Sequence, residues 1–149
     1  MAQLVSMTED DYQQFVAWAV PDYAQEQDKA VERAEYAFGT LSADGLSTPN
    51  QFFCVIEDET SKQKVGNIWY GICGEEEGRF VAIHELMIYE EYRRQGYGSQ
   101  ALLALEDKVN ELGIKQVALH VLGHNGGARA LYRESGYRER DVTMLKELD

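Results

Sequence analysis

The sequence predicts a single α/β domain in which one mixed β-sheet is covered by helices on both faces. The 149 residues suit one domain with its own core, since 44% are hydrophobic and only two are proline. Strand patterns cluster in the middle of the chain, and helical and strand patterns alternate toward its end. No linker, internal repeat or low-complexity tract interrupts residues 1–149.

The first half of the chain predicts two helices followed by strands. Thr8 precedes three acidic residues, which places a hydroxyl cap before an acidic first turn, and apolar side chains then recur at helical spacing. Pro21 is expected to end this helix, and a second helix is predicted over residues 22–41. Runs rich in β-branched and aromatic residues predict three strands, over residues 51–57, 65–73 and 79–89. The third strand has almost no polar alternation, so we expect it to be covered on both faces.

The second half alternates between helix and strand. A basic, glycine-rich turn over residues 93–98 leads into an amphipathic helix over residues 99–112. Residues 116–122 follow as a strand in which apolar side chains alternate. Asn125 is a typical N-cap and opens another helix. A last strand is predicted over residues 137–148.

The charge of the chain excludes some classes of partner. With 26 acidic and 14 basic residues the net charge is −12, which argues against general binding to nucleic acid or to an anionic membrane. No apolar run reaches the roughly 18 residues that a membrane span needs, and no signal peptide is visible, so we expect a soluble, cytoplasmic protein. Residues 1–79 carry a net charge of −10 and residues 80–149 only −2. The first part could therefore attract a cation, or its acidic helix faces are simply solvated.

The glycine-rich turn predicts an anion site. It lies between a buried strand and an amphipathic helix, where the first amides of the helix have no internal acceptor and the helix dipole favours negative charge. Gly96 and Gly98 let the backbone approach a ligand closely, and Arg93 and Arg94 add positive charge. A pyrophosphate fits such a cradle. The plain alternative is a turn that merely joins strand to helix.

A dinucleotide-binding enzyme is a further alternative. Residues 96–101 fit the fingerprint G-x-G-x-x-G/A. However, the motif comes late in the chain, and the strand over residues 116–122 ends without the acidic residue that binds a ribose.

Two motifs resemble those of the GNAT superfamily of acetyl-CoA-dependent N-acetyltransferases. Arg93-Arg94-Gln95-Gly96-Tyr97-Gly98 is similar to its [Q/R]-x-x-G-x-[G/A] signature, and residues 125–137 are similar to its N-x-x-A-x-x-L-Y-x-x-x-G-[F/Y] stretch. The resemblance covers about residues 80–148. It implies the GNAT fold, a central, mixed and mostly antiparallel twisted sheet with a splayed strand pair. Residues 1–149 would form a single N-acetyltransferase domain, with the acceptor side in residues 1–79 and the acetyl-CoA-binding core in residues 80–149.

The resemblance also implies where acetyl-CoA binds. Its pantetheine arm would lie between residues 86–89 and 117–122, bonded to backbone groups like an added strand. Members often have other residues at positions 90, 94 and 95, so pyrophosphate binding here should depend more on backbone amides. Gly98→Val is expected to weaken acetyl-CoA binding while retaining the fold. The implied cofactor-binding residues are Leu86, Met87, Ile88, Arg93, Arg94, Gln95, Gly96, Tyr97, Gly98, Ser99 and Asn125.

Acetyl transfer to an amine needs a neutral amine, a stabilised oxyanion and a proton for the departing thiolate. A backbone amide near Leu86 or Met87 would serve the oxyanion. Glu85 is an acid inside an otherwise apolar strand and is the candidate general base, acting directly or through a water. It is equally well explained as a structural buried acid. Tyr132 is the family-matched general acid for the thiolate, or else a packing tyrosine. Asn125 caps its helix and is implied to contact the cofactor as well.

The remaining chemistry-bearing residues favour no other site. His84-Glu85 begins like H-E-x-x-H, but position 88 is Ile, so we expect no metal. Cys54 and Cys73 have no partner base and are expected in the core. We therefore expect an acyltransferase that moves an acetyl group from acetyl-CoA to a primary amine of a small molecule or peptide in a ternary complex, and the acidic first part of the chain hints at a cationic acceptor. The alternative is a non-catalytic acyl-CoA-binding or regulatory module. The sequence does not name the acceptor or distinguish monomer from homodimer.

Overall fold

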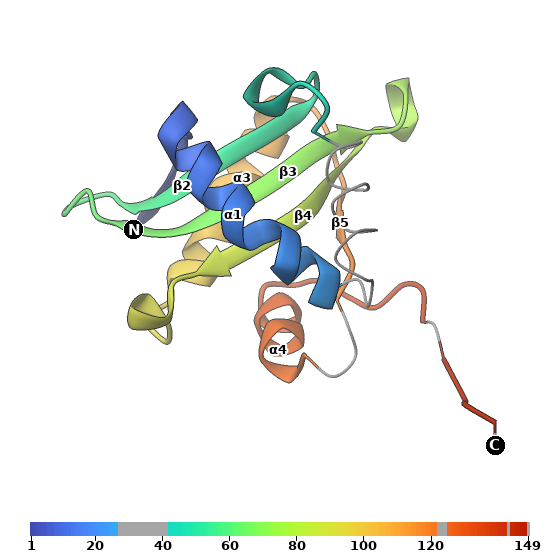
Figure 1. Ribbon diagram of the computed structural model, residues 1–149. Helices are drawn as coiled ribbons and strands as arrows, with labels where there is room; N and C mark the ends of the chain where they lie inside the picture. Colours follow the sequence, from blue (N-terminus) through green and yellow to red (C-terminus); the bar gives the residue numbers. More distant parts are fainter. Residues whose placement is uncertain (27–41, 122–124, 143, 149) are drawn as a thin grey trace.

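The computed structural model describes residues 1–26, 42–121, 125–142 and 144–148. Within them a five-stranded sheet has the order β1-β2-β3-β4-β5, with helices packed against it (Figure 1). The elements are β1 Ala2–Ser6, α1 Glu9–Glu26, β2 Gln51–Asp58, β3 Lys64–Cys73, β4 Phe80–Ile88, α3 Tyr97–Glu111, β5 Val117–Leu119 and α4 Gly126–Glu134.

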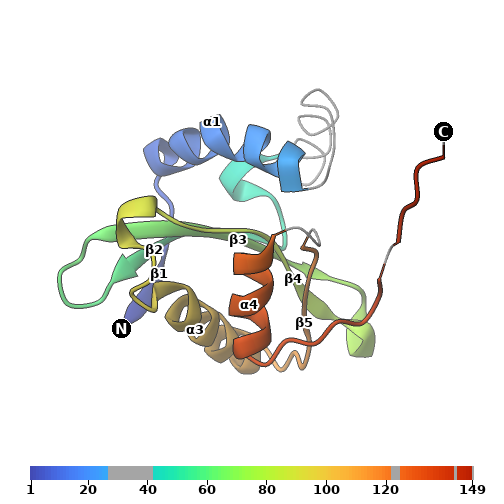
Figure 2. The same cartoon turned by 90° about the horizontal axis from the view of Figure 1, so that it is seen from below.

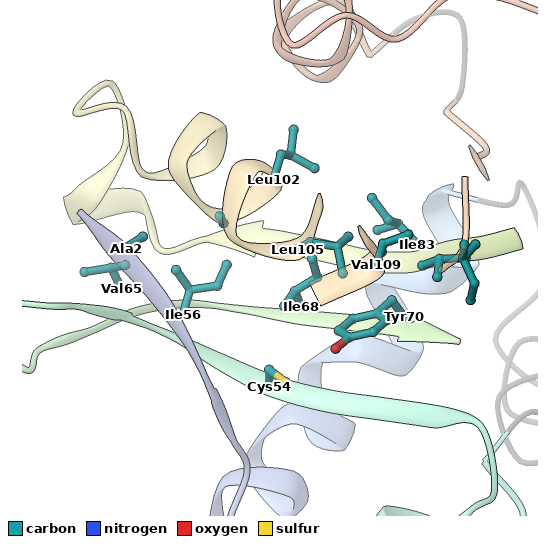
Figure 3. Packing of buried hydrophobic residues seen from close by; sticks show 13 residues of the cluster. Ala2, Cys54, Ile56, Val65, Ile68, Tyr70, Ile83, Leu102, Leu105 and Val109 are labelled. Atoms are coloured by element: carbon teal, nitrogen blue, oxygen red, sulfur yellow. The ribbon is translucent and has the colours of Figure 1, made fainter. Parts of the chain in front are cut away.

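Helices lie on both faces of the sheet, as the sequence predicts. Figure 2 shows α1 on one face and α3 with α4 on the other. Each face has its own hydrophobic core. The α1-side core contains Phe15, Phe53 and Trp69, whose rings meet edge-on or stacked. The larger α3-side core is drawn in Figure 3 and includes Ile56, Val65, Ile68, Tyr70, Ile83, Leu102, Leu105 and Val109.

The sheet is mixed, and its last strand pair diverges. Strands β1 to β4 are antiparallel neighbours, whereas β4 and β5 run parallel. This parallel pairing covers only three residues of each strand, 81–83 with 117–119, although β4 continues to Ile88. Beyond Ile83, no described strand pairs with this edge of β4. This confirms the expected GNAT architecture, including the splayed pair.

Several element predictions are corrected. The chain begins with a strand, β1, that sequence reasoning missed, because five residues without clear alternation give no local signal. Helix α1 continues through Pro21 to Glu26, so the proline does not end it. The remainder of the predicted second helix, residues 27–41, lies outside the described residues. The predicted strand over residues 137–148 is wrong, since its described residues form neither strand nor helix.

Gly66 in β3 allows a close approach to β4 that no other residue permits. A Cβ atom built there would fall on the carbonyl oxygen of Met87 and 3.0 Å from the Cα of Ile88. These are backbone atoms, which cannot move aside as a flexible side chain would. We expect Gly66→Ala to lower the free energy of unfolding by about 1–3 kcal/mol, measured by urea denaturation.

Gly78→Ala provides the matched control for this prediction. A Cβ at Gly78 has no atom within 4 Å, so that substitution should leave the unfolding midpoint nearly unchanged. If the two variants unfold at the same urea concentration, the backbone of β4 at Met87 and Ile88 can move away from position 66 at little cost.

Candidate active site

The N-terminus of α3 forms a backbone cradle. Gly96 caps the helix in the left-handed conformation, with φ of 84°, which glycine adopts without strain. The Gln100 amide donates to the Gly96 carbonyl oxygen at 3.1 Å. The three preceding amides, those of Tyr97, Gly98 and Ser99, belong to the first turn, where an α-helix offers no internal acceptor. These donors and the helix dipole favour an anion at this point.

The side chains around the cradle hold the turn in place. Arg93 donates from Nε to the Ile88 carbonyl oxygen at 2.8 Å, and Gln95 donates from Nε2 to the Glu91 carbonyl oxygen at 3.3 Å. The Tyr97 hydroxyl donates to Asp58 at 2.7 Å, which ties the start of α3 to the end of β2. The side chains of Arg93, Gln95 and Tyr97 are thus engaged in bonds within the protein. A ligand at the cradle would therefore meet mainly backbone amides.

Asp58 gathers several donors at this junction. The backbone amide of Ser61 and the Tyr97 hydroxyl are the main groups that lower the pKa of its carboxyl to about 2. The carboxylate therefore stays ionised and keeps Tyr97 in place over the whole physiological pH range.

Gly98 has a packing role that the sequence did not indicate. A Cβ atom built there would lie 3.1 Å from the Leu131 Cδ2 of α4 and 3.9 Å from the Ile88 side chain. The glycine thus lets α3, α4 and β4 approach one another. For Gly98→Val to keep the fold as expected, the side chain of Leu131 has to move aside by a few tenths of an ångström.

The register of β4 selects which backbone groups face β5. The Tyr89 amide donates to the Val65 carbonyl oxygen at 2.8 Å, which makes these two residues a hydrogen-bonded antiparallel pair. Alternation then turns the polar backbone groups of Met87 toward β3 and those of Leu86 and Ile88 away from it. The Leu86 amide therefore lies on the β5 side of β4, beyond the last residue that pairs with β5. Of the predicted trio, Leu86 is suited to meet a ligand in the gap, and Met87 is not.

A β-bulge in β4 places two titratable side chains on one face. Trp69 lies opposite Glu85 and Tyr70 lies opposite Ile83, so His84 is the extra residue. Glu85 shares the face of its cross-strand partner Trp69 and is 5% exposed. The His84 ring also lies against Trp69, with centroids 4.6 Å apart. Both side chains therefore point to the α1 side of the sheet.

Sequence reasoning considered His84 only as part of a metal motif, which it rejected, whereas the structure places this side chain beside Glu85. Its Nε2 atom is buried without a hydrogen-bond partner, and burial lowers the pKa of the imidazole to about 4. The ring is therefore neutral near pH 7. A bulge depends on pairing with a distant strand, so no local signal could have placed His84 beside Glu85.

Helix α4 carries the second motif. Asn125 caps it as predicted, with its side-chain oxygen accepting from the Ala128 amide at 3.2 Å. Tyr132 is half-buried against the α3-side core, and its ring meets that of Tyr137 edge-on with centroids 5.7 Å apart. Tyr132 and Glu85 thus lie on opposite faces of the sheet. Two such side chains can serve reactants that arrive from opposite sides of the gap.

Other reactive groups of the described residues are poorly suited to chemistry. Cys54 lies in the α3-side core as predicted, and burial raises the pKa of its thiol to about 11, so it stays protonated. Within the residues that the structure describes, no three His, Cys, Asp or Glu side chains form a group that could hold a metal ion. None of the helices described is both long and apolar enough to cross a membrane.

The family model of the acetyltransferase (GNAT) family matches residues 6–137. The chain belongs to this family. The match covers strands β2 to β5 and both motifs, and membership of the family implies acyltransferase activity. The two motifs by which the sequence resembles GNAT enzymes therefore identified the family.

Individual relatives agree with this assignment. YycN of Bacillus subtilis (strain 168), an uncharacterized N-acetyltransferase, is 33% identical over 153 residues, which cover 97% of each chain. The crystal structure of YycN superposes with a TM-score of 0.91 at 29% identity and covers 99% of both chains. A thialysine N-ε-acetyltransferase of Sus scrofa is 26% identical over 122 residues, 76% of this chain and 72% of the relative.

Proposed function

We propose that this GNAT protein transfers an acetyl group from acetyl-CoA to a primary amine by direct attack in a ternary complex. The observation that carries the proposal is the backbone cradle at the start of α3, beside the gap where β4 leaves β5. A diphosphate suits the cradle, and an extended amide-bearing arm suits the exposed strand edge. Acetyl-CoA, when bound, supplies an acetyl group activated as a thioester.

The backbone would hold the ligand and polarise it. The amides of Tyr97, Gly98 and Ser99 donate to the diphosphate, and Arg94, exposed at the mouth of the cradle, adds charge. The edge of β4 hydrogen-bonds the pantetheine amides in the manner of an added strand. The Leu86 amide donates to the thioester oxygen, where negative charge develops as the amine attacks. Asn125 positions α4 at the far side of the gap.

Glu85 would prepare the amine. A lysine-type amine has a pKa of about 10.4, so at neutral pH it must lose a proton before it can attack. A buried carboxylate on the α1 side of the sheet can accept that proton directly or through a water.

The acceptor we propose is a cationic amine. The strongly acidic first part of the chain attracts positive charge, and the name of the Sus scrofa relative specifies an ε-amino group of thialysine. Lysine analogues and polyamines are therefore the first acceptors to assay, ahead of aminoglycosides and peptide N-termini.

The test is an acceptor screen with the purified protein and acetyl-CoA, in which release of free thiol is measured. We expect thiol release that depends on a cationic amine and an acetylated product by mass spectrometry. Saturable binding of acetyl-CoA without turnover on any amine would instead identify an acyl-CoA-binding module. Binding of NAD in place of acetyl-CoA would refute the cradle assignment.

Tyr132→Phe tests the general acid. If the phenol protonates the departing thiolate, the variant should lose about 10²-fold in kcat, the lower end of acid–base effects, because a thiolate with a pKa near 8.5 leaves readily. The affinity for acetyl-CoA should be unchanged in calorimetry. Tyr137→Phe is the matched control, since that ring packs against Tyr132. An equal loss in both variants would indicate a packing role.

A further inference from the structure

Three polar side chains lie together on the apolar face of the sheet that α1 covers. Asn67 of β3 lies opposite Val55, a residue of the α1-side core, and is only 4% exposed. His84 and Glu85 reach the same face from β4, as the bulge dictates. Buried polar side chains are uncommon in such a layer, so a group of them indicates a place where a polar ligand binds.

The Nε2 atom of His84 has no role within the protein. It is buried, and no described residue forms a hydrogen bond with it. Most buried polar atoms in folded proteins are hydrogen-bonded, so an exception calls for an explanation. A buried N–H without an acceptor is rarer than an acceptor without a donor, which favours the tautomer with the proton on Nδ1 and a lone pair on Nε2. Such an atom suits a ligand that donates a hydrogen bond.

The imidazole ring is held in place by its neighbours. It lies against the indole of Trp69, with centroids 4.6 Å apart, and that indole is fully buried and stacked on Phe53. The indole is fixed in turn, because its Nε1 donates to Oε1 of Gln51 at 2.8 Å. The position of His84 beside Glu85 is therefore set by packing.

The charge of this spot suits a cation. Burial lowers the pKa of the His84 imidazole to about 4, so near pH 7 the ring is neutral and does not repel an ammonium group. Glu85 follows directly in the chain, and the Leu86 amide comes next on the β5 side of β4. Three consecutive residues thus offer a lone pair, a carboxyl group and an amide donor.

We propose that His84 is a specificity residue for the acceptor, whose attacking amine donates a hydrogen bond to the Nε2 lone pair and is held beside Glu85. The proposal rests on the proposed function, since it places the amine next to the proposed base. A primary ammonium carries three protons on its nitrogen. One passes to Glu85 and leaves the lone pair that attacks the thioester, and a second makes the bond to Nε2. His84 itself takes no proton.

Two substitutions at this position separate binding of the amine from packing. His84→Leu fills much of the same space without a lone pair, and it should lower kcat/KM for thialysine at least tenfold, as expected for a lost hydrogen bond to a charged group. Acetyl-CoA affinity should stay unchanged. The urea midpoint at pH 7 should not fall, because Nε2 has no partner in the protein to lose. His84→Gln should restore most of the activity, since its amide oxygen can reach the position of Nε2.

Tyr137→Phe is the matched control for these kinetics. It also removes a buried polar atom that has no hydrogen-bond partner among the described residues, but one that belongs to the α3-side core. This variant should keep the wild-type kcat/KM for thialysine.

Nitrogen-15 NMR detects the contact without turnover. Protein labelled in its three histidines is saturated with CoA, which carries no acetyl group, and thialysine or spermidine is then added. The Nε2 signal that His84→Leu lacks should move toward that of a hydrogen-bonded nitrogen, while the signals of the other two histidines should not.

Three results would overturn the proposal and leave the proposed function in place. Equal kcat/KM of the wild type and His84→Leu would show that the amine does not need this residue. An equal loss in His84→Leu and His84→Gln, with a lower urea midpoint in both, would make it a packing residue. An Nε2 signal unaffected by either amine would exclude the contact. Failure of the proposed function differs from these, because the wild type would then acetylate no amine, even one that moves the Nε2 signal.

Discussion

Glu85→Gln is expected to lower kcat by about 10²–10⁴-fold and to leave acetyl-CoA affinity unchanged. The amide keeps the size of the carboxylate but cannot accept a proton. Since Glu85 lies on the α1 side of β4 and is almost fully buried, the change should not reach the cradle at α3. A catalytic base predicts a lower kcat with unchanged acetyl-CoA affinity, whereas a structural acid predicts a loss of both.

The measurement is steady-state kinetics with the best acceptor, together with calorimetric binding of acetyl-CoA. Glu57→Gln is the matched control, because Glu57 is a half-buried glutamate in the same sheet, where it accepts from Gln3 at 3.0 Å. It should keep wild-type turnover. Unchanged kcat in Glu85→Gln would remove this residue from the mechanism, and loss of acetyl-CoA binding would make its role structural.

Acidification is expected to destabilise the fold through His84. Burial lowers the pKa of this imidazole from its usual 6.5 to about 4. Between these values the unfolded chain binds a proton that the folded chain does not, so stability falls as the pH decreases from 6.5 to 4. The full loss is roughly 3 kcal/mol, and below pH 4 both states are protonated and His84 contributes no further change.

Urea denaturation at several pH values measures this effect. Acidic residues also contribute to the pH dependence, so the quantity of interest is the difference in slope between the wild type and His84→Gln, which cannot titrate. The slope should be steeper in the wild type between pH 6.5 and pH 4. A histidine resonance of the folded protein that titrates near pH 6.5 and is lost in His84→Gln would contradict the prediction.

Local motifs account for what the sequence predicted well. Asn125 at the start of α4 occupies the capping position expected of it, because a cap depends on only four or five neighbouring residues. The central strands are recognisable because their apolar and β-branched residues are continuous. The family followed from two such motifs in the right order.

Features that depend on distant pairing were not predictable. The bulge at His84 exists only in relation to Trp69 and Tyr70, and the packing role of Gly98 exists only because Leu131 lies above it. The tail from Tyr137 onward shows the same limit, since a strand pattern becomes a strand only when an edge is available to it. The roles of Glu85 as base and Tyr132 as acid are proposals that the Glu85→Gln and Tyr132→Phe variants test.

The extra residue in β4 has a consequence for how the site can be altered. Regular pleating sends neighbouring side chains to opposite faces, so without the bulge one of His84 and Glu85 would project into the apolar layer beneath α3. Deleting residue 84 would leave Ile83 opposite Tyr70 and Glu85 opposite Trp69. We therefore expect that residue 84 can be deleted without a change in the pairing of the other residues of β4 with β3. Such a deletion would remove the second polar side chain beside the Glu85 carboxylate.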